Sequence, residues 1–297
     1  MGHRDPFSSY HPLVTFLYFA LVLVFTMCFL HPVSLCISLL CALAYTVVLS
    51  GRKSVRRSMG YMLPMALMAT VCNALFSHKG DTLLCRLPTG TVTLESAVFG
   101  LATGVMLAAV ILWFGCYSAV MTSDKFIYLF GRIIPSLSLV LSMTLSFIPR
   151  FKNQFRVVVQ AQQSFSRSLT EGKLKARIKR GAKILSIMIT WSLENAIETA
   201  DSMKSRGYGL PGRSAFSVYH FEARDKLALC WLLACGGVII AGWAMGGIAW
   251  TYYPVMSCTL TEPLAVLSQL AYLALSATPV ILKGKEDRKW NYSRSTI

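Results

Sequence analysis

Arg206, which stands directly before Gly207, is the residue of this 297-residue chain best suited to specific recognition chemistry. An arginine guanidinium presents a planar fork of donors that can bind a carboxylate through two hydrogen bonds. Gly207 suits the left-handed position that ends a helix, and Arg206 then lies at the negative end of the helix dipole. We therefore expect Ser205, Arg206 and Gly207 to form a contact site for a partner protein, in which Arg206 pairs with a carboxylate. A solvated helix end with a glycine stop is the open alternative.

Residues that would support catalysis or metal binding are scattered in this sequence. The five histidines are far apart, the nine cysteines form no CxxC pair, and neither a paired-aspartate motif nor HExxH occurs. The apolar runs contain no Asp or Lys, and Glu95 and Glu262 stand at their ends. We expect no catalytic residue, no cofactor and no bound metal, so a membrane-embedded enzyme is the weakest alternative. A disulfide between Cys85 and Cys258 stays open.

The composition indicates a polytopic membrane protein. Hydrophobic residues make up 55% of the chain and charged residues only 14%, whereas soluble domains contain about 25% charged residues. The net charge of +16 results from 29 Lys and Arg against 13 Asp and Glu. Cytoplasmic loops of membrane proteins are rich in basic residues, so this excess indicates a protein embedded in membrane lipid. We do not expect it to bind nucleic acid.

Hydropathy and loop charge predict an all-α fold with about six transmembrane helices and both termini in the cytoplasm. If residues 133–149 also crossed the membrane, residues 150–226, with fifteen basic and six acidic side chains, would lie outside, against the usual bias. We therefore expect 133–149 to form a helix along the cytoplasmic boundary, with a true span as the alternative. The six expected spans are residues 13–30, 33–49, 61–76, 94–121, 227–250 and 263–282.

The charged segment between the fourth and fifth spans is expected to form cytoplasmic helices. Residues 151–165 form an amphipathic pattern, and apolar residues recur three and four apart from residue 173 to Arg206. The chain is thus divided into N-terminal transmembrane helices (1–132), cytoplasmic or interfacial coupling helices (133–226) and C-terminal transmembrane helices (227–297). One apolar stripe of the long helix is expected to face a partner, and it consists of Leu185, Met188, Leu193 and Ile197.

Two motifs of this segment resemble a known family. Residues 203–209 (Met-Lys-Ser-Arg-Gly-Tyr-Gly) and residues 146–150 (Ser-Phe-Ile-Pro-Arg) are similar to motifs of the transmembrane (T) component of energy-coupling factor (ECF) transporters, the CbiQ/EcfT-like family. The resemblance covers about residues 140–215. It implies a non-catalytic subunit in a prokaryotic cell membrane whose partners are two ATP-binding cassette ATPases and a small substrate-binding S subunit. Signature arginines would contact the ATPases, the apolar stripe would face the S subunit, and the complex would import a vitamin or a metal ion.

The sequence departs from the family at its first signature, which normally reads Ala-Gln-x-Ala-Arg-Gly. Here Phe165 and Ser166 stand at the arginine and glycine positions, and Arg167 follows. With Ser164 these residues are a second candidate contact with an ATPase. A conventional ABC importer permease is the main alternative function, but it would use one short coupling helix rather than a charged segment as long as residues 150–226.

Overall fold

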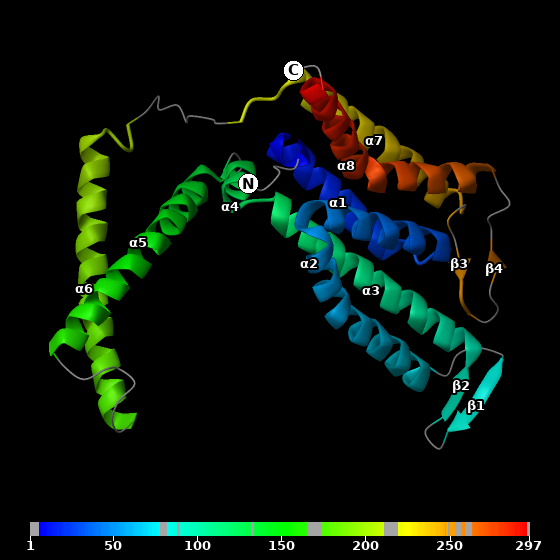
Figure 1. Ribbon diagram of the computed structural model, residues 1–297, viewed down its shortest axis with the longest axis horizontal. Coiled ribbons are helices and arrows are strands. Elements are labelled where there is room, and N and C mark those ends of the chain that lie inside the picture. Colours follow the sequence, from blue (N-terminus) through cyan, green and yellow to red (C-terminus); the bar gives the residue numbers. More distant parts are fainter. Residues whose placement is uncertain are drawn as a thin grey trace. The chain divides into compact units, whose positions relative to one another are not determined.

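The computed structural model describes residues 6–77, 82–87, 90–131, 134–165, 174–210, 219–246, 248, 250–253, 257–258 and 263–295. Helices make up most of this part of the chain, which confirms the predicted all-helical membrane fold (Figure 1). The helices are η1 (Pro6–Ser9), α1 (Pro12–Cys28), α2 (Pro32–Phe76), α3 (Leu94–Val120), α4 (Ser123–Gly131), α5 (Pro135–Phe165), α6 (Leu174–Ser205), α7 (Ala223–Ala244) and α8 (Pro263–Ser295).

The chain divides into two compact units. One comprises residues 1–126 and 219–297, and the other comprises residues 127–218. We call the second the coupling unit and the first the membrane unit. The three-part division expected from the sequence, with boundaries at residues 132 and 226, stays a prediction.

Four helical stretches are long and apolar enough to cross a membrane, namely Pro32–Gly51, Leu94–Val120, Ala223–Ala244 and Pro263–Glu286. Each coincides with one of the six predicted spans. Another predicted span lies in α1, an apolar helix of 17 residues. The sixth lies in the part of α2 that follows Gly51. At Gly51 itself φ is 76° and ψ is 167°, and the helix kinks there. The total of six spans stays a prediction.

The first two helices of the membrane unit begin in the same way, each at a histidine followed by a proline. The Nδ1 atoms of His11 and His31 accept the backbone N–H groups of Leu13 and Val33, each at 3.2 Å. Proline suits the first helical position because its missing N–H would have no helical partner there. His31 is 1% exposed, so its capping bond is made inside the protein.

Aromatic side chains fill the core of the membrane unit. Tyr18, Trp113 and Tyr272 are at most 1% exposed and come from α1, α3 and α8. Trp113 and Tyr272 belong to a buried network: Trp113 Nε1 donates to Ser38 Oγ at 3.0 Å, and Thr26 Oγ1 lies 2.9 Å from Ser38 Oγ and 2.8 Å from Tyr272 Oη. These bonds connect four helices where no water is available to replace them.

α2 and α3 approach each other closely at two glycines of α3 (Figure 1). A Cβ atom at Gly100 would lie 2.8 Å from the carbonyl oxygen of Thr70, and one at Gly104 would lie 2.7 Å from that of Ala66. Small residues four apart allow helix backbones to touch in this way in membranes. The Gly100–Gly104 pair therefore fixes the second part of α2 against α3.

Two short antiparallel hairpins lie in the connections between α2 and α3 and between α7 and α8. β1 (Leu83–Leu87) pairs with β2 (Gly90–Thr93), and β3 (Trp250–Thr251) pairs with β4 (Ser257–Cys258). Single short hairpins are hard to recognise in a sequence because they carry little apolar alternation. The side chains of Cys85 and Cys258, and with them the open question of a disulfide, lie outside the described part of the chain.

The coupling unit is built around α5 and α6, which run in opposite directions and pack against each other. Val158 of α5 and Ile184 and Met188 of α6 form their small buried core, and the rings of Phe147 and Trp191 stack with centroids 5.6 Å apart. α5 continues through Pro149, so the stretch expected along the membrane boundary and the amphipathic helix after it form one helix. α5 is not among the span candidates of the described chain.

Candidate coupling site at the end of helix α6

The end of α6 is closed by a regular Schellman cap. The N–H of Tyr208 donates to the carbonyl oxygen of Met203 and the N–H of Gly207 to that of Lys204, each at 3.0 Å. Gly207 has φ +77°, the left-handed conformation that glycine adopts without strain. The predicted glycine cap is therefore confirmed, and it places Arg206 at the junction between helix and turn.

The neighbours of Arg206 are bonded within the helix end itself. Ser205 donates its hydroxyl to the carbonyl oxygen of Ser202 at 2.9 Å, so its side chain closes the last turn. The N–H of Leu210 donates to the carbonyl oxygen of Gly207 at 3.3 Å. Arg206 is exposed, and within the described ranges no carboxylate lies within ion-pair distance of it. The turn thus presents one guanidinium whose donors are available to a partner.

The charges along α6 change sign toward this end. The first half of the helix is basic, with Lys175, Lys179 and Lys183, whereas Glu194 and Glu198 follow in the second half. Lys204 and Arg206 return positive charge to the last turn, where the helix dipole favours cations. A carboxylate that approaches the tip meets the positive charge of Arg206 before the acidic stretch behind it.

The residues of the degenerate first signature are only partly described. Ser164 is exposed in the last turn of α5, and its hydroxyl donates to the carbonyl oxygen of Gln160 at 3.1 Å. Phe165 is the last residue of that helix, but its side chain, together with Ser166 and Arg167, lies outside the described part. The second candidate contact with an ATPase therefore stays a prediction.

The predicted apolar stripe of α6 is split between two faces of the helix. Leu185, Leu193 and Ile197 are 60%, 61% and 64% exposed, but Met188 is 2% exposed and packs against α5. This placement does not support the prediction that Met188 shares a partner-facing surface, because α5 covers the face of α6 on which Met188 lies. Ile189, 52% exposed and four residues after Leu185, continues the exposed row instead.

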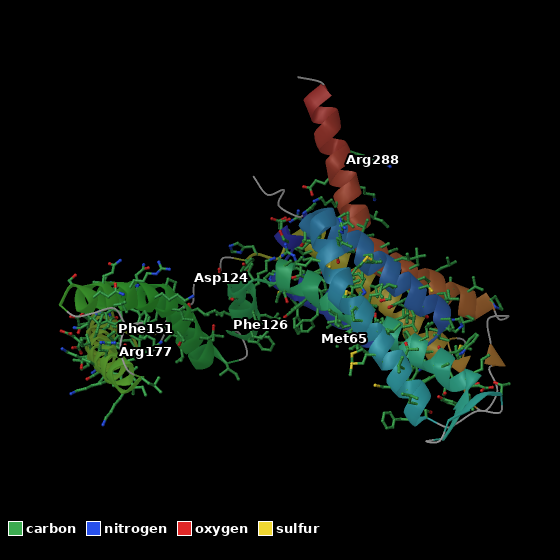
Figure 2. The ribbon with its side chains drawn as sticks, turned by 60° about the horizontal axis from the view of Figure 1, so that its bottom comes forward. Met65, Asp124, Phe126, Phe151, Arg177 and Arg288 are labelled. Atoms are coloured by element: carbon green, nitrogen blue, oxygen red, sulfur yellow. The ribbon has the colours of Figure 1, made fainter. Side chains whose placement is uncertain are left out.

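We call this row of Leu185, Ile189, Leu193 and Ile197 the exposed stripe. Figure 2 shows the side chains of the coupling unit, with Phe151 marking α5 and Arg177 marking α6. Phe151 belongs to the contact between the two helices, where its ring centroid is 6.5 Å from that of Trp191. The helix pair is therefore held by one narrow apolar face, and the exposed stripe is additional apolar surface.

The described part of the chain holds no group of three or more His, Cys, Asp or Glu side chains that could bind a metal ion. The cysteines at positions 28, 36, 41, 72, 116, 230 and 235 are free thiols. The end of α6 thus combines an exposed cation, a glycine turn and, earlier on the same helix, an exposed apolar row.

Comparison with known proteins supports a role in transport. Residues 8–218 match the family CbiQ, described as "Cobalt transport protein". The chain is 28% identical over 184 residues to the energy-coupling factor transporter transmembrane protein EcfT of Bacillus selenitireducens, a match that covers 58% of this chain and 69% of that protein. It is 26% identical to EcfT of Listeria innocua, again over 58% and 69% of the two chains. With EcfT of Lactobacillus helveticus it is 31% identical over 36% of this chain and 39% of that protein.

Proposed function

This chain belongs to the CbiQ family of cobalt transport proteins, and from this premise we propose that it transmits the ATP-driven motion of two cassette ATPases to a small substrate-binding S subunit. It is a multi-pass membrane protein and a non-catalytic transmembrane component of the energy-coupling factor type. We also propose that the chain lies in a prokaryotic plasma membrane with both termini in the cytoplasm. The complex that it forms with these partners would import a vitamin or a metal ion.

The observation that carries the proposal is the exposed Arg206 on the rigid end of α6. Bidentate binding of a carboxylate needs a guanidinium that is held in place yet free of other anions. The Schellman cap fixes the backbone on both sides of Arg206, and Arg206 has no carboxylate partner in the described chain. We infer that a carboxylate in a groove of an ATPase subunit is its partner.

The exposed stripe is the proposed route from the ATPase contact to the S subunit. Leu193 and Ile197 lie on α6, two to four turns before Arg206 at its end, so a displacement of the helix end moves them together with the rest of the helix. An apolar stripe of this kind suits an apolar face of another membrane protein. The coupling helices would in this way convert closure of the ATPases into a shift of the S subunit.

The degenerate first signature suggests that the two ATPases are held unequally. With Phe165 and Ser166 in place of arginine and glycine, the end of α5 offers no guanidinium at the usual position. Ser164 and Arg167 are the polar candidates that remain there. We therefore propose that one ATPase is bound through Arg206 and the other more weakly or by apolar contact.

The experiment that tests the proposal replaces Arg206 in the complex of this chain with its copurifying ATPases. Removing one partner of a charge-assisted bidentate pair in a buried interface costs about 2–5 kcal/mol, so Arg206→Ala should weaken ATPase binding by tens-fold or more. Arg206→Lys should restore binding only in part because an ammonium lacks the planar fork. Insertion into the membrane should stay normal.

The matched control is Lys179→Ala, which removes one exposed positive charge from the basic half of the same helix. It should leave ATPase binding almost unchanged. Equal losses with Lys179→Ala and Arg206→Ala would show that α6 acts only as a basic surface. Copurification of no nucleotide-binding chain with the wild type would reject the proposed function itself.

A further inference from the structure

Six residues near the N-terminus, Pro6–His11, contact both places where the coupling unit joins the membrane unit. The coupling unit, residues 127–218, follows Phe126 and ends before Tyr219. Lys125 on one side of it and Asp225 on the other both bond to the backbone of Pro6–His11. All of these residues belong to the membrane unit, so the contacts exist within one compact body.

On the first side, Lys125 is buried, with 6% of its surface exposed. Its Nζ donates to the carbonyl oxygen of Ser8 at 2.6 Å and to that of Val120 at 3.1 Å. A buried ammonium is tolerated only when its donors are paired, and Val120 is the last residue of α3, whose free carbonyls favour a cation. Lys125 therefore joins the end of α3, the start of α4 and the N-terminal segment.

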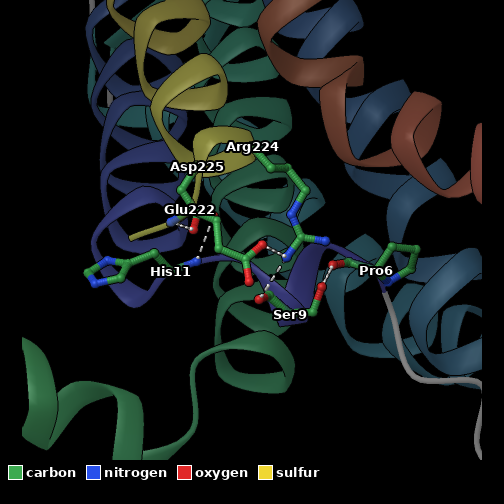
Figure 3. Close-up of polar contacts among 6 residues, drawn as sticks. All are labelled: Pro6, Ser9, His11, Glu222, Arg224 and Asp225. Carbon is green, nitrogen blue, oxygen red and sulfur yellow. Dashed lines mark hydrogen bonds and ion pairs between the residues drawn. The ribbon is translucent and has the colours of Figure 1, made fainter. Parts of the chain in front are cut away.

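On the second side, Asp225 is 2% exposed and accepts two backbone N–H groups, from His11 and from Glu222, each at 3.1 Å (Figure 3). The bond from Glu222 belongs to the capping box that starts α7. Asp225 therefore joins the first turn of α7, which follows the coupling unit, to the same N-terminal segment.

Arg224 adds a second connection on this side. Its guanidinium donates to the carbonyl oxygen of Ser9 at 3.5 Å (Figure 3). It also lies 4.6 Å from the ring centroid of Tyr10. Glu222 lies 3.8 Å from the same guanidinium. Cation–π contact at a partly exposed site stabilises modestly, so Arg224 supports the arrangement that the buried Asp225 fixes.

The N-terminal segment is itself fixed to the core. Its first residues form the short helix η1, in which Ser9 donates its hydroxyl to the carbonyl oxygen of Pro6 at 2.7 Å. Phe7 is 2% exposed, and its ring packs edge-on against Tyr18 with centroids 5.0 Å apart. The segment is a firm support because its anchor lies in the centre of the membrane unit.

We propose that Pro6–His11 is a clamp, held by Lys125 and Asp225, that keeps the two junctions of the coupling unit at a fixed separation during transport. This inference rests on the proposed function. If the junctions moved independently, displacement of the coupling helices would be dissipated in local rearrangement of the chain. Lys125 and Asp225 are positioning residues in this scheme, because they touch neither nucleotide nor transported solute but hold the elements that transmit force.

The test is the ratio of solute uptake to ATP hydrolysis in vesicles that contain the complete complex. Lys125→Met keeps the length of the side chain and removes its donors, and Asp225→Asn keeps the shape and removes the charge. In both variants we expect the ATPases to stay bound and to hydrolyse ATP, while uptake per ATP falls about tenfold, as for the removal of roughly one charge-assisted hydrogen bond. Arg224→Gln, at an exposed position, should give a smaller decrease in the same direction.

Each positioning residue has one control variant, which removes the charge of the residue next to it. Asp124→Asn and Lys226→Met alter exposed side chains and should leave uptake per ATP unchanged. The clamp is rejected if Lys125→Met and Asp225→Asn lower the amount of complex but leave uptake per ATP unchanged. If neither variant protein accumulates in the membrane, the clamp is rejected when Arg224→Gln shows the same uptake per ATP as the wild type. It is also rejected if the control variants uncouple equally. Failure of the proposed function is recognised separately, because the wild-type chain would then bind no ATPase.

Discussion

The backbone N–H of Tyr208 donates to the carbonyl oxygen of Met203 across the last turn of α6, at 3.0 Å. This bond exists only because Gly207 between them turns the chain with φ +77°. The direction in which Arg206 leaves the helix therefore depends on a glycine that touches no partner.

Gly207→Ala should accordingly weaken the binding of an ATPase although the arginine is retained. An L-residue in the left-handed conformation costs roughly 1–2 kcal/mol, and the new Cβ would lie 3.1 Å from Leu210 Cδ1. We expect the affinity to fall by about five- to thirtyfold, measured by titration of detergent-solubilised protein with the ATPase subunits. Gly181→Ala is the control, since Gly181 lies in the same helix with open space at Cβ; an equal loss there would contradict the role of the cap.

The glycine cap and the apolar spans could be predicted from the sequence because each depends on local chemistry. Glycine is the residue that enters the left-handed conformation at little cost, and uncharged runs of span length have few other uses. The placement of Met188 could not be predicted in the same way. Helical periodicity separates the faces of α6, but both faces are apolar, and only the position of α5 decides that Met188 is covered and Leu185 is not.

The clamp could not be predicted for a related reason. Lys125 and Asp225 lie among other charged residues of loops and helix ends, and nothing in their neighbours marks them as buried. Their partners are backbone groups of residues 117 and 214 positions away, which no short pattern encodes. Only the packing of η1 against the membrane unit brings these groups together.

The exposed stripe should be sensitive to charge. Leu193→Glu replaces a side chain that is worth about 1.5–3 kcal/mol when fully buried, and it places a carboxylate in an apolar contact. We expect the S subunit to be absent from the purified complex while both ATPases remain. Thr199→Glu is the control, because it adds the same charge at an exposed polar position of α6. Loss of the ATPases with Leu193→Glu would place the stripe in the other interface.

Any side chain larger than hydrogen at position 104 should destabilise the contact between α2 and α3. A Cβ there would lie 2.7 Å from the carbonyl oxygen of Ala66, so Gly104→Val forces the helices apart. Overpacking costs about 1–3 kcal/mol, and in a chain of this size each kcal/mol lowers the Tm by roughly 2–4 °C. Thermal unfolding in detergent measures this shift. Gly115→Val, in the same helix with open space around its Cβ, should leave the Tm nearly unchanged.

The stability of the membrane unit should fall in mild acid through His11. Burial lowers the pKa of His11 below its ordinary value of 6.5, although Asp225 acts in the opposite direction. The folded chain thus binds the proton less readily than the unfolded chain, so this contribution to stability is complete above pH 6.5 and is lost as the pH falls toward the lowered pKa. Protonation also removes the acceptor that Nδ1 offers to Leu13.

His11→Asn is the matched variant for this effect, because asparagine caps a helix well and does not titrate in this range. The Tm of the wild type should fall more than that of His11→Asn when the pH is lowered from about 8 to about 5. A constant difference between the two proteins over this range would show that His11 does not contribute to the pH dependence.

The buried network of the membrane unit should behave as one unit when its hydroxyls are removed. Thr26 Oγ1 lies 2.8 Å from Tyr272 Oη and 2.9 Å from Ser38 Oγ, so Thr26→Val and Tyr272→Phe each leave the other members with an unsatisfied group. We expect a coupling energy of about 0.5–2 kcal/mol in a double-mutant cycle, because the second substitution removes a bond that the first has already broken. Thr46→Val provides the comparison, since Thr46 bonds to Cys116 and to the carbonyl oxygen of Ala42 and shares none of these partners. The losses of stability caused by Thr46→Val and Tyr272→Phe should add in the double variant. If the losses caused by Thr26→Val and Tyr272→Phe also add, the hydroxyls of Thr26 and Tyr272 stabilise the bundle independently.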